Sequence, residues 1–252
     1  MQQVNLESEV YEEFMRCLSV LKDICNDVDI RAGFIRQRTN DKATVFEFDL
    51  TSLISDMTLP ISNIKQKIDL LKIFSDQTVT ITSHDEDDEH SNGYFTMSDE
   101  FTTLKFDGID LEYIDNVFMD EEERNSIFPC DESDMILSTD ISKKISDRIR
   151  IIAQSFSVNT TQVKFEGDFA SINVSTQSHE QHANVSSELT TEREMNCVSS
   201  LPITPFITDH DGDINFKMFN YQDNICSNSC KTMIADVELN VYSRSALIEE
   251  DD

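Results

Sequence analysis

Positive charge is scarce in this chain of 252 residues, and much of it is grouped. Asp and Glu outnumber Lys and Arg by 49 to 20, which gives a formal net charge of −29. Nine basic residues fall in three short segments whose apolar residues repeat at helical spacing: Arg16 and Lys22; Lys65, Lys67 and Lys72; Lys143, Lys144, Arg148 and Arg150. Ammonium and guanidinium groups on a helix can hold a row of phosphate oxygens. We therefore expect a protein that repels polyanions over most of its surface and accepts one along a single path.

Residue types that support catalysis are present, but their spacing singles out no active site. The sequence contains no G-x-x-x-x-G-K, G-x-G-x-x-G or G-x-S-x-G motif for phosphate binding or nucleophilic catalysis. Carboxylates are so numerous that no catalytic pair stands out among them. We therefore expect a protein that is not an enzyme and that uses no cofactor.

Three groups of residues resemble fragments of metal sites, and each has a simpler explanation. Cys226 and Cys230 form a C-x3-C pair in what reads as a polar loop, with no second pair at zinc-ribbon spacing. His179 and His182 form H-x2-H within a polar stretch. The segment 209–213 lacks the glutamate that closes a calcium loop. We expect no metal site.

Composition indicates a folded, soluble protein. Apolar residues make up 38% of the chain, with only 5 Gly and 4 Pro, which is enough to bury a core despite the net charge. No apolar run approaches the length of a membrane span, and no apolar stretch near Met1 predicts a signal peptide. Six scattered cysteines suit reduced thiols. We expect an intracellular protein without membrane contact, in the host cytoplasm or nucleus if it is viral.

The basic segments are predicted to be three helices. An apolar stripe that includes Phe14, Leu18 and Leu21 predicts the first helix over 9–27, with Ser8 as its N-cap. The second, over 61–74, follows Pro60. The third helix is defined by an apolar stripe of Ile141, Ile145, Ile149, Ile152 and Phe156.

The third helix is the most basic, and its apolar stripe predicts where its cations point. We expect its N-terminus to be capped within 138–140. With Ile145 at the centre of the apolar face, Lys143 and Arg150 lie about 140–160° away and point opposite the core. Lys144 and Arg148 then lie on the flank. Lysines on the outer face of a helix are often merely solvated, but the acidic background favours a functional role here.

Strands fill most of the remaining chain. Apolar or alternating runs predict strands over 30–38, 44–50, 78–83, 94–98, 101–106, 162–166, 170–176, 214–220 and 233–243. The polar stretch 177–194 is predicted to be mostly loop. The segment 201–208, which contains Pro202 and Pro205, can form at most a helix-like turn.

The order of helices and strands occurs twice, on either side of an acidic segment. We therefore expect an α+β fold of two similar domains, each with helices on one face of an antiparallel sheet. The N-terminal domain is predicted over 1–110, the acidic interdomain connector over 111–134, and the C-terminal domain over 135–252.

Three stretches carry a resemblance to a known family. Residues 14–50 run from a long helix into an Ile-Arg-Ala-Gly-Phe hairpin, and 59–106 run from a Leu-Pro-anchored helix to Thr-Leu-Lys-Phe. Residues 195–219 pass a Leu-Pro turn and end in Ile-Asn-Phe-Lys-Met-Phe. In this order they resemble the DNA sliding clamps, or polymerase processivity factors, of the viral and phage branch and, more distantly, proliferating cell nuclear antigen. The resemblance covers most of the chain as topology and includes no invariant motif.

The resemblance implies a ring-forming protein rather than an enzyme. Three subunits of two clamp-type domains would close head to tail as a homotrimer, with helices lining the hole and edge strands pairing between subunits. Such a ring encircles duplex DNA without sequence preference and tethers the replicative DNA polymerase after a clamp loader has placed it. The nine basic residues given above are then the DNA-facing candidates, through phosphate contacts alone.

The resemblance also implies a binding site for client proteins, which insert a short hydrophobic peptide beside the connector of a clamp. The candidate partner-binding residues in the connector and near the C-terminus are Leu111, Tyr113, Val117, Phe118, Leu247 and Ile248. Covering the core where the domains join is an equally good explanation for each of them.

Two departures from the clamp pattern keep alternatives open. Pro202 and Pro205 shorten the fourth helix that a clamp would turn toward DNA, and the net charge is extreme. An acidic DNA-mimicking inhibitor, or an adaptor protein of the same fold that does not bind DNA, would explain the acidity. A mimic has no use for basic helices, so Lys143, Lys144 and Arg150 count against it.

Overall fold

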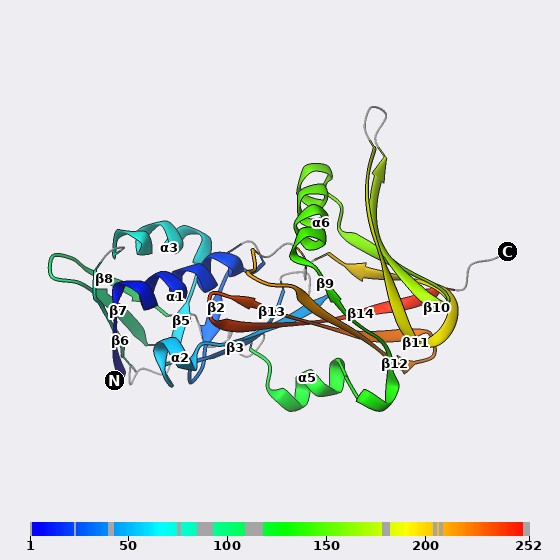
Figure 1. Ribbon diagram of the computed structural model, residues 1–252. Helices are drawn as coiled ribbons and strands as arrows, with labels where there is room; N and C mark the ends of the chain where they lie inside the picture. The colour runs from blue at the N-terminus through cyan, green and yellow to red at the C-terminus, as the bar shows by residue number, and fades with distance from the viewer. Residues whose placement is uncertain are drawn as a thin grey trace. The chain divides into compact units, whose positions relative to one another are not determined.

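The computed structural model describes residues 2–22, 24–39, 43–74, 77–84, 93–108, 118–177, 182–203, 206 and 209–248. The chain divides into two compact units (Figure 1). Unit 1 comprises residues 1–42, 46–120 and 234–239, and unit 2 comprises residues 43–45, 121–233 and 240–252. Both combine helices with antiparallel strands, which confirms the predicted α+β class.

Unit 1 contains a four-stranded antiparallel sheet and two further strand pairs. The sheet has the order β1-β6-β7-β8, while β2 pairs with β5 and β3 pairs with β4. Alternate residues of β6 are buried, as expected for a sheet with one face on the core. The strands are β1 (Gln2–Leu6), β2 (Val28–Ile30), β3 (Phe34–Arg38), β4 (Thr44–Asp49), β5 (Leu59–Ile61), β6 (Val79–His84), β7 (Tyr94–Ser98) and β8 (Thr103–Asp107).

Two helices of unit 1 lie side by side (Figure 1). They are α1 (Ser8–Leu21) and α3 (Ile64–Leu71), and the latter continues into the 3-10 turn η1 (Lys72–Phe74). The Tyr11 hydroxyl on α1 donates a hydrogen bond of 2.7 Å to the carbonyl of Leu71. Both predicted helices are confirmed, and both end earlier than predicted. The N-cap of α1 is Glu7 rather than Ser8. The α3 helix begins at Ile64 because Ile61 belongs to β5.

A tight turn splits the predicted strand 30–38 into β2 and β3. Ala32 and Gly33 both have positive φ, of 50° and 78°. A Cβ added to Gly33 would lie 2.1 Å from the carbonyl oxygen of Ser55, so the fold requires glycine there. The short helix α2 (Thr51–Ile54), which the sequence did not predict, ends at this contact.

Unit 2 contains six strands in the order β10-β11-β9-β12-β13-β14, and β11 also pairs with β14. Cys226 and Cys230 are buried on β13, so the prediction of a polar loop there was wrong. The single strand predicted over 233–243 is interrupted by a turn at Ala235, where φ is 51°. The strands are β9 (Met135–Ile141), β10 (Thr160–Gln177), β11 (His182–Pro202), β12 (Ile214–Gln222), β13 (Ile225–Ile234) and β14 (Val237–Ile248).

Strands β10 and β11 form a long hairpin that passes beside helix α6 (Lys143–Phe156) (Figure 1). Gly167 pairs with Met195 and Phe169 with Thr190, which leaves residues 191–194 of β11 opposite Asp168 alone. The hairpin bends at this bulge. The prediction that 177–194 is mostly loop was wrong, because Val185 and Leu189 alternate with polar residues and bury one face of the strand.

Two short elements lie within the predicted acidic connector 111–134, in its part that belongs to unit 2: α5 (Glu121–Ile127) and η2 (Glu132–Asp134). The end of α5 is fixed by cation–π contacts: Arg124 lies 4.4 Å from the ring centre of Tyr242, and Arg244 lies 5.7 Å from that of Phe128. The Arg244 Nε also donates to the carbonyl of Ile127 at 2.6 Å.

In the ranges that the structure describes, none of the helices has both the length and the apolar composition to cross a membrane.

Candidate functional site

Helix α6 carries the largest group of predicted phosphate-binding residues. Its N-cap is Ser142, whose hydroxyl accepts from the Ile145 amide, so the cap predicted within 138–140 was wrong and those residues extend β9. The side chains that α6 buries are Ser146, Ile149, Ile152 and Ala153. The buried face is therefore centred near Ile149 rather than Ile145.

This rotation reverses the expected orientation of the four cations. Lys144 and Arg148 are exposed, whereas Lys143 and Arg150 are half-buried, so the prediction that Lys143 and Arg150 point directly away from the core was wrong. The physical reason lies in Ser146, a polar residue that is fully buried on α6 and that no hydrophobic pattern could place.

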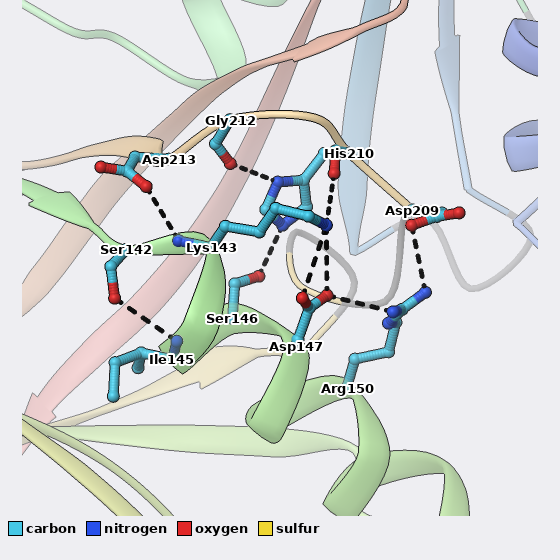
Figure 2. A network of polar contacts seen from close by, with 10 residues as sticks. All are labelled: Ser142, Lys143, Ile145, Ser146, Asp147, Arg150, Asp209, His210, Gly212 and Asp213. Atoms are coloured by element: carbon cyan, nitrogen blue, oxygen red, sulfur yellow. Dashed lines mark hydrogen bonds and ion pairs between the residues drawn. The ribbon is translucent and has the colours of Figure 1, made fainter.

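Lys143 and Arg150 are held by acidic and carbonyl oxygens of unit 2 (Figure 2). The Lys143 Nζ donates to the His210 carbonyl at 2.6 Å and lies 3.4 Å from Asp147. The Arg150 Nη2 bonds Asp147 at 3.0 Å, and its Nη1 lies 3.5 Å from Asp209. Two of the four α6 cations are thus already paired inside the protein.

His210 links the segment 209–213 to the buried face of α6 (Figure 2). Its Nδ1 lies 2.6 Å from the Gly212 carbonyl, which can only accept, so Nδ1 carries the proton. Its Nε2 therefore accepts from the Ser146 hydroxyl at 2.7 Å. Burial lowers the pKa of His210, and the charges of Lys143 and Arg150 act in the same direction, while the Gly212 hydrogen bond and Asp147 oppose the shift. The net lowering favours this neutral ring. The segment 209–213, called the strap below, is thus fixed to α6 by hydrogen bonds.

The basic side chains of unit 1 also differ in how exposed they are and in whether they form ion pairs. Lys65 is exposed on α3, and Arg16 and Lys22 at α1 are half-buried. Lys72 pairs with Asp69 at 2.8 Å, an arrangement that lowers the pKa of the carboxyl.

Lys67 has a structural role in the same helix. Its Nζ donates to the Ser62 hydroxyl at 2.8 Å and lies 5.5 Å from the centre of the Phe106 ring. Burial lowers the pKa of Lys67, although the charge of Asp107 opposes this shift. Lys65 on α3 and Lys72 in η1 are therefore the lysines of this segment that are exposed to solvent.

The predicted partner-binding residues fall in different parts of the chain. Leu111, Tyr113 and Val117 lie outside the described residues. Phe118 belongs to unit 1, where its backbone bridges to Gln37 and its ring lies 4.2 Å from the Arg31 guanidinium.

The two C-terminal candidates belong to unit 2. The Leu247 amide donates to the Asn224 carbonyl at 2.7 Å, which fixes this part of β14. Ile248 is paired with Val198 of β11 through the backbone, and 61% of its side chain area is exposed. Ile248 is therefore available to a partner, whereas Leu247 is partly covered.

Several exposed apolar side chains were not predicted to be functional. Phe169, at the bulge of β10, is 59% exposed and lines a cavity of about 400 Å³ together with Lys164, Ala170 and Glu188. Phe101, directly before β8, is 81% exposed. Ile151 is 58% exposed on α6, and its place outside the apolar stripe was the one signal available in the sequence.

Metal-binding residues are not grouped in the described part of the chain. No three His, Cys, Asp or Glu side chains there come together as a set of ligands. His179 and the side chain of His182 are outside what the structure describes.

Removing the imidazole of His210 is expected to change how stability depends on pH. The unfolded chain takes up a proton on histidine near pH 6.5, whereas the native ring, whose pKa is lowered, takes it up only at lower pH. The contribution of His210 is therefore complete above about pH 6.5 and is lost as pH falls through the native pKa. In urea unfolding between pH 7 and 5, His210→Gln should lose less stability on acidification than the wild type. Parallel pH profiles for the two proteins would contradict this assignment.

Comparisons with known proteins identify the fold. No protein-family model matches the chain, and no curated protein sequence is similar to it. Among solved structures, PCNA from Thermococcus kodakaraensis matches with a TM-score of 0.60 and 13% identity over 98% of each chain. The PCNA2-PCNA3 complex from Sulfolobus tokodaii matches with a TM-score of 0.58 and 11% identity, over 98% of this chain and 99% of that one.

A third structure, of the C-terminal region of FEN-1 bound to A. fulgidus PCNA, matches with a TM-score of 0.57 and 9% identity over the full length of both chains. At these identities the likeness establishes the fold rather than the function. The chain has the fold of the PCNA sliding clamps, which confirms the resemblance seen in the sequence. The closer relation to the viral branch stays a prediction.

Proposed function

We propose that this chain, which has the sliding-clamp fold, is a subunit of a ring that encircles duplex DNA and tethers a replicative polymerase. The observation that carries the proposal is the combination of this fold with exposed cations on α6 in a protein of net charge −29. The predicted division into domains 1–110 and 135–252, with a connector over 111–134, is part of the proposal. The protein acts as a scaffold and catalyses no reaction.

The proposed hold on DNA is topological, and the direct contacts are weak. Lys144 and Arg148 are the α6 side chains best placed to meet phosphates because both are exposed. Lys65 plays the same role on α3, and Lys72 in η1 contributes less because it is already paired with Asp69. Phosphate contacts of this kind are independent of sequence and fall steeply with salt, so the ring can slide.

We propose that the ring closes by strand pairing between copies. An edge strand of unit 1 in one copy would pair with an edge strand of unit 2 in the next copy. Among the described strands, β8 is an edge of the unit 1 sheet and β10 is an edge of the unit 2 sheet. Each edge carries a largely exposed aromatic side chain, Phe101 beside β8 and Phe169 on β10. Backbone pairing between such edges, with apolar side chains as anchors, is a common mode of strand addition. We propose that such head-to-tail contacts close a ring of three copies, as the sliding-clamp fold suggests.

Client binding is proposed at the connector. Phe118, whose ring lies 4.2 Å from the Arg31 guanidinium in unit 1, is the described candidate at the connector, and the exposed Ile248 in unit 2 is a separate candidate. One of the matched structures holds the C-terminal region of FEN-1 on a PCNA, which supports a peptide-binding role for the same fold. The polymerase and a clamp loader are the proposed clients of this site.

Charge reversal on α6 tests the DNA contact. The double variant Lys144→Glu/Arg148→Glu is expected to lower polymerase processivity. It should also reduce the slope of log K against log salt for binding to a short duplex by about 0.9 for each side chain. Lys217→Glu/Lys231→Glu, which makes the same change in net charge on strands β12 and β13, should retain both properties. Unchanged slope and processivity in the α6 variant, with assembly intact, would favour the adaptor or DNA-mimic alternatives.

Single substitutions at the proposed edges test ring closure. Wild-type protein should show a concentration-dependent species near three times 28.9 kDa in light scattering after size exclusion. Phe101→Asp or Phe169→Asp should yield monomers, because either change places a charge in the apolar contact between copies. Ile248→Asp serves as the control, since that side chain is about as exposed as Phe169 but belongs to β14, which pairs with β11 rather than forming the β10 edge. A trimer that survives both Phe substitutions would place the contact elsewhere.

A further inference from the structure

We propose that Asp147 and Asp209 act as internal competitors of DNA phosphate that limit how tightly α6 can hold DNA. This inference rests on the proposed function and concerns what limits the affinity of that same α6 surface for DNA. Its starting point is the arrangement in Figure 2, in which both carboxylates lie against cations of α6.

Asp147 is placed to neutralise two cations at once. It lies one helical turn from each of them along α6, at the i+4 position from Lys143 and the i−3 position from Arg150. Its carboxylate is 3.4 Å from the Lys143 Nζ and 3.0 Å from the Arg150 Nη2. Helix neighbours at these spacings face each other, so the pairing is preorganised by the helix itself.

Asp209 adds a second carboxylate from outside the helix. It lies 3.5 Å from the Arg150 Nη1, and the strap that carries it is fixed to α6 by the His210–Ser146 hydrogen bond. The Lys143 amide also donates to Asp213 at 2.9 Å, which holds the other end of the strap.

The paired cations keep some capacity for a stronger partner. The Lys143 and Arg150 side chains are 38% and 25% exposed, so phosphate oxygens can reach them. The buried Arg150 Nε has no hydrogen-bond partner in the described part of the chain. A phosphate would have to displace a carboxylate already in contact, so each paired cation contributes less to DNA binding than an unpaired one.

The affinity of the α6 surface for DNA therefore depends on its carboxylates as well as on its lysines and arginines. Lys144 and Arg148 meet the polyanion directly, while Lys143 and Arg150 stay occupied unless a partner is removed. Weak phosphate contacts of this kind suit a ring that must stay on DNA and still slide along it.

The test measures equilibrium binding of a short fluorescein-labelled duplex to the full-length protein over a series of salt concentrations. Asp147→Asn should steepen the slope of log K against log salt by about 0.9 for each released cation, and so by up to about 1.8. Asp209→Asn should give a smaller increase, because it removes only one of the two carboxylates that pair with Arg150 and leaves Lys143 paired with Asp147. Asp209 is 64% exposed, so this second variant is expected to fold even if Asp147→Asn does not.

Two further variants make the outcomes distinguishable. Glu132→Gln, which makes the same change in net charge and releases Lys217 from a 2.7 Å ion pair away from α6, should leave the slope unchanged. Ile151→Lys adds a cation to the exposed face of α6 and should steepen the slope by about 0.9.

Suppose that Ile151→Lys steepens the slope and neither aspartate variant does. This result would overturn the role of Asp147 and Asp209 as competitors, and the proposed function would still hold. If Ile151→Lys and the Lys144/Arg148 reversal also leave the slope unchanged, α6 does not face DNA and the proposed function itself fails. An increase equal in Glu132→Gln and Asp147→Asn would overturn the inference as well, because net charge alone would then explain it.

Discussion

The charge balance of the chain is the constraint on which its other features depend. With 49 acids and 20 bases, a lysine or arginine finds a carboxylate close by unless the fold keeps one away. Arg36 pairs with Glu47 at 2.6 Å, Arg31 with Asp29 at 2.7 Å and Lys217 with Glu132 at 2.7 Å. The number of cations that can meet a polyanion is therefore decided by local structure. On α6, Asp147 pairs with Lys143 and Arg150, whereas the side chains of Lys144 and Arg148 are exposed to solvent.

Much of the fold was predictable because it rests on apolar periodicity. The stripes of α1, α3 and α6 are strong enough that all three helices were identified, and the strands β6, β7 and β12 follow alternating apolar residues. Recurrence of the same element order on both sides of an acidic segment was enough to suggest a sliding clamp. This agrees with structural likeness at identities of only 9–13%, since a pattern of buried positions can persist when few residues are shared.

The errors arose where local composition does not report the tertiary partner of a residue or the element to which it belongs. Ser146 is buried on α6 because His210, 64 residues away along the chain, accepts its hydrogen bond, and no local pattern reports such a partner. Ile141 seemed to belong to the helical stripe but lies at the end of β9, which shifted the predicted centre of the helix. Likewise β11 is rich in Ser, Thr and Glu because one face of the hairpin is solvated, so its composition resembles a loop.

A direct test of the central claim compares retention of the protein on circular and linear DNA. The protein would be loaded onto a nicked plasmid, washed at moderate salt, and measured before and after the plasmid is cut once. A sliding ring should remain on the closed circle and leave within the time needed to diffuse to the new ends. Equal retention on circular and linear DNA would contradict the proposal that the protein is a sliding ring. So would a failure to stay on the circular DNA when a clamp loader is supplied.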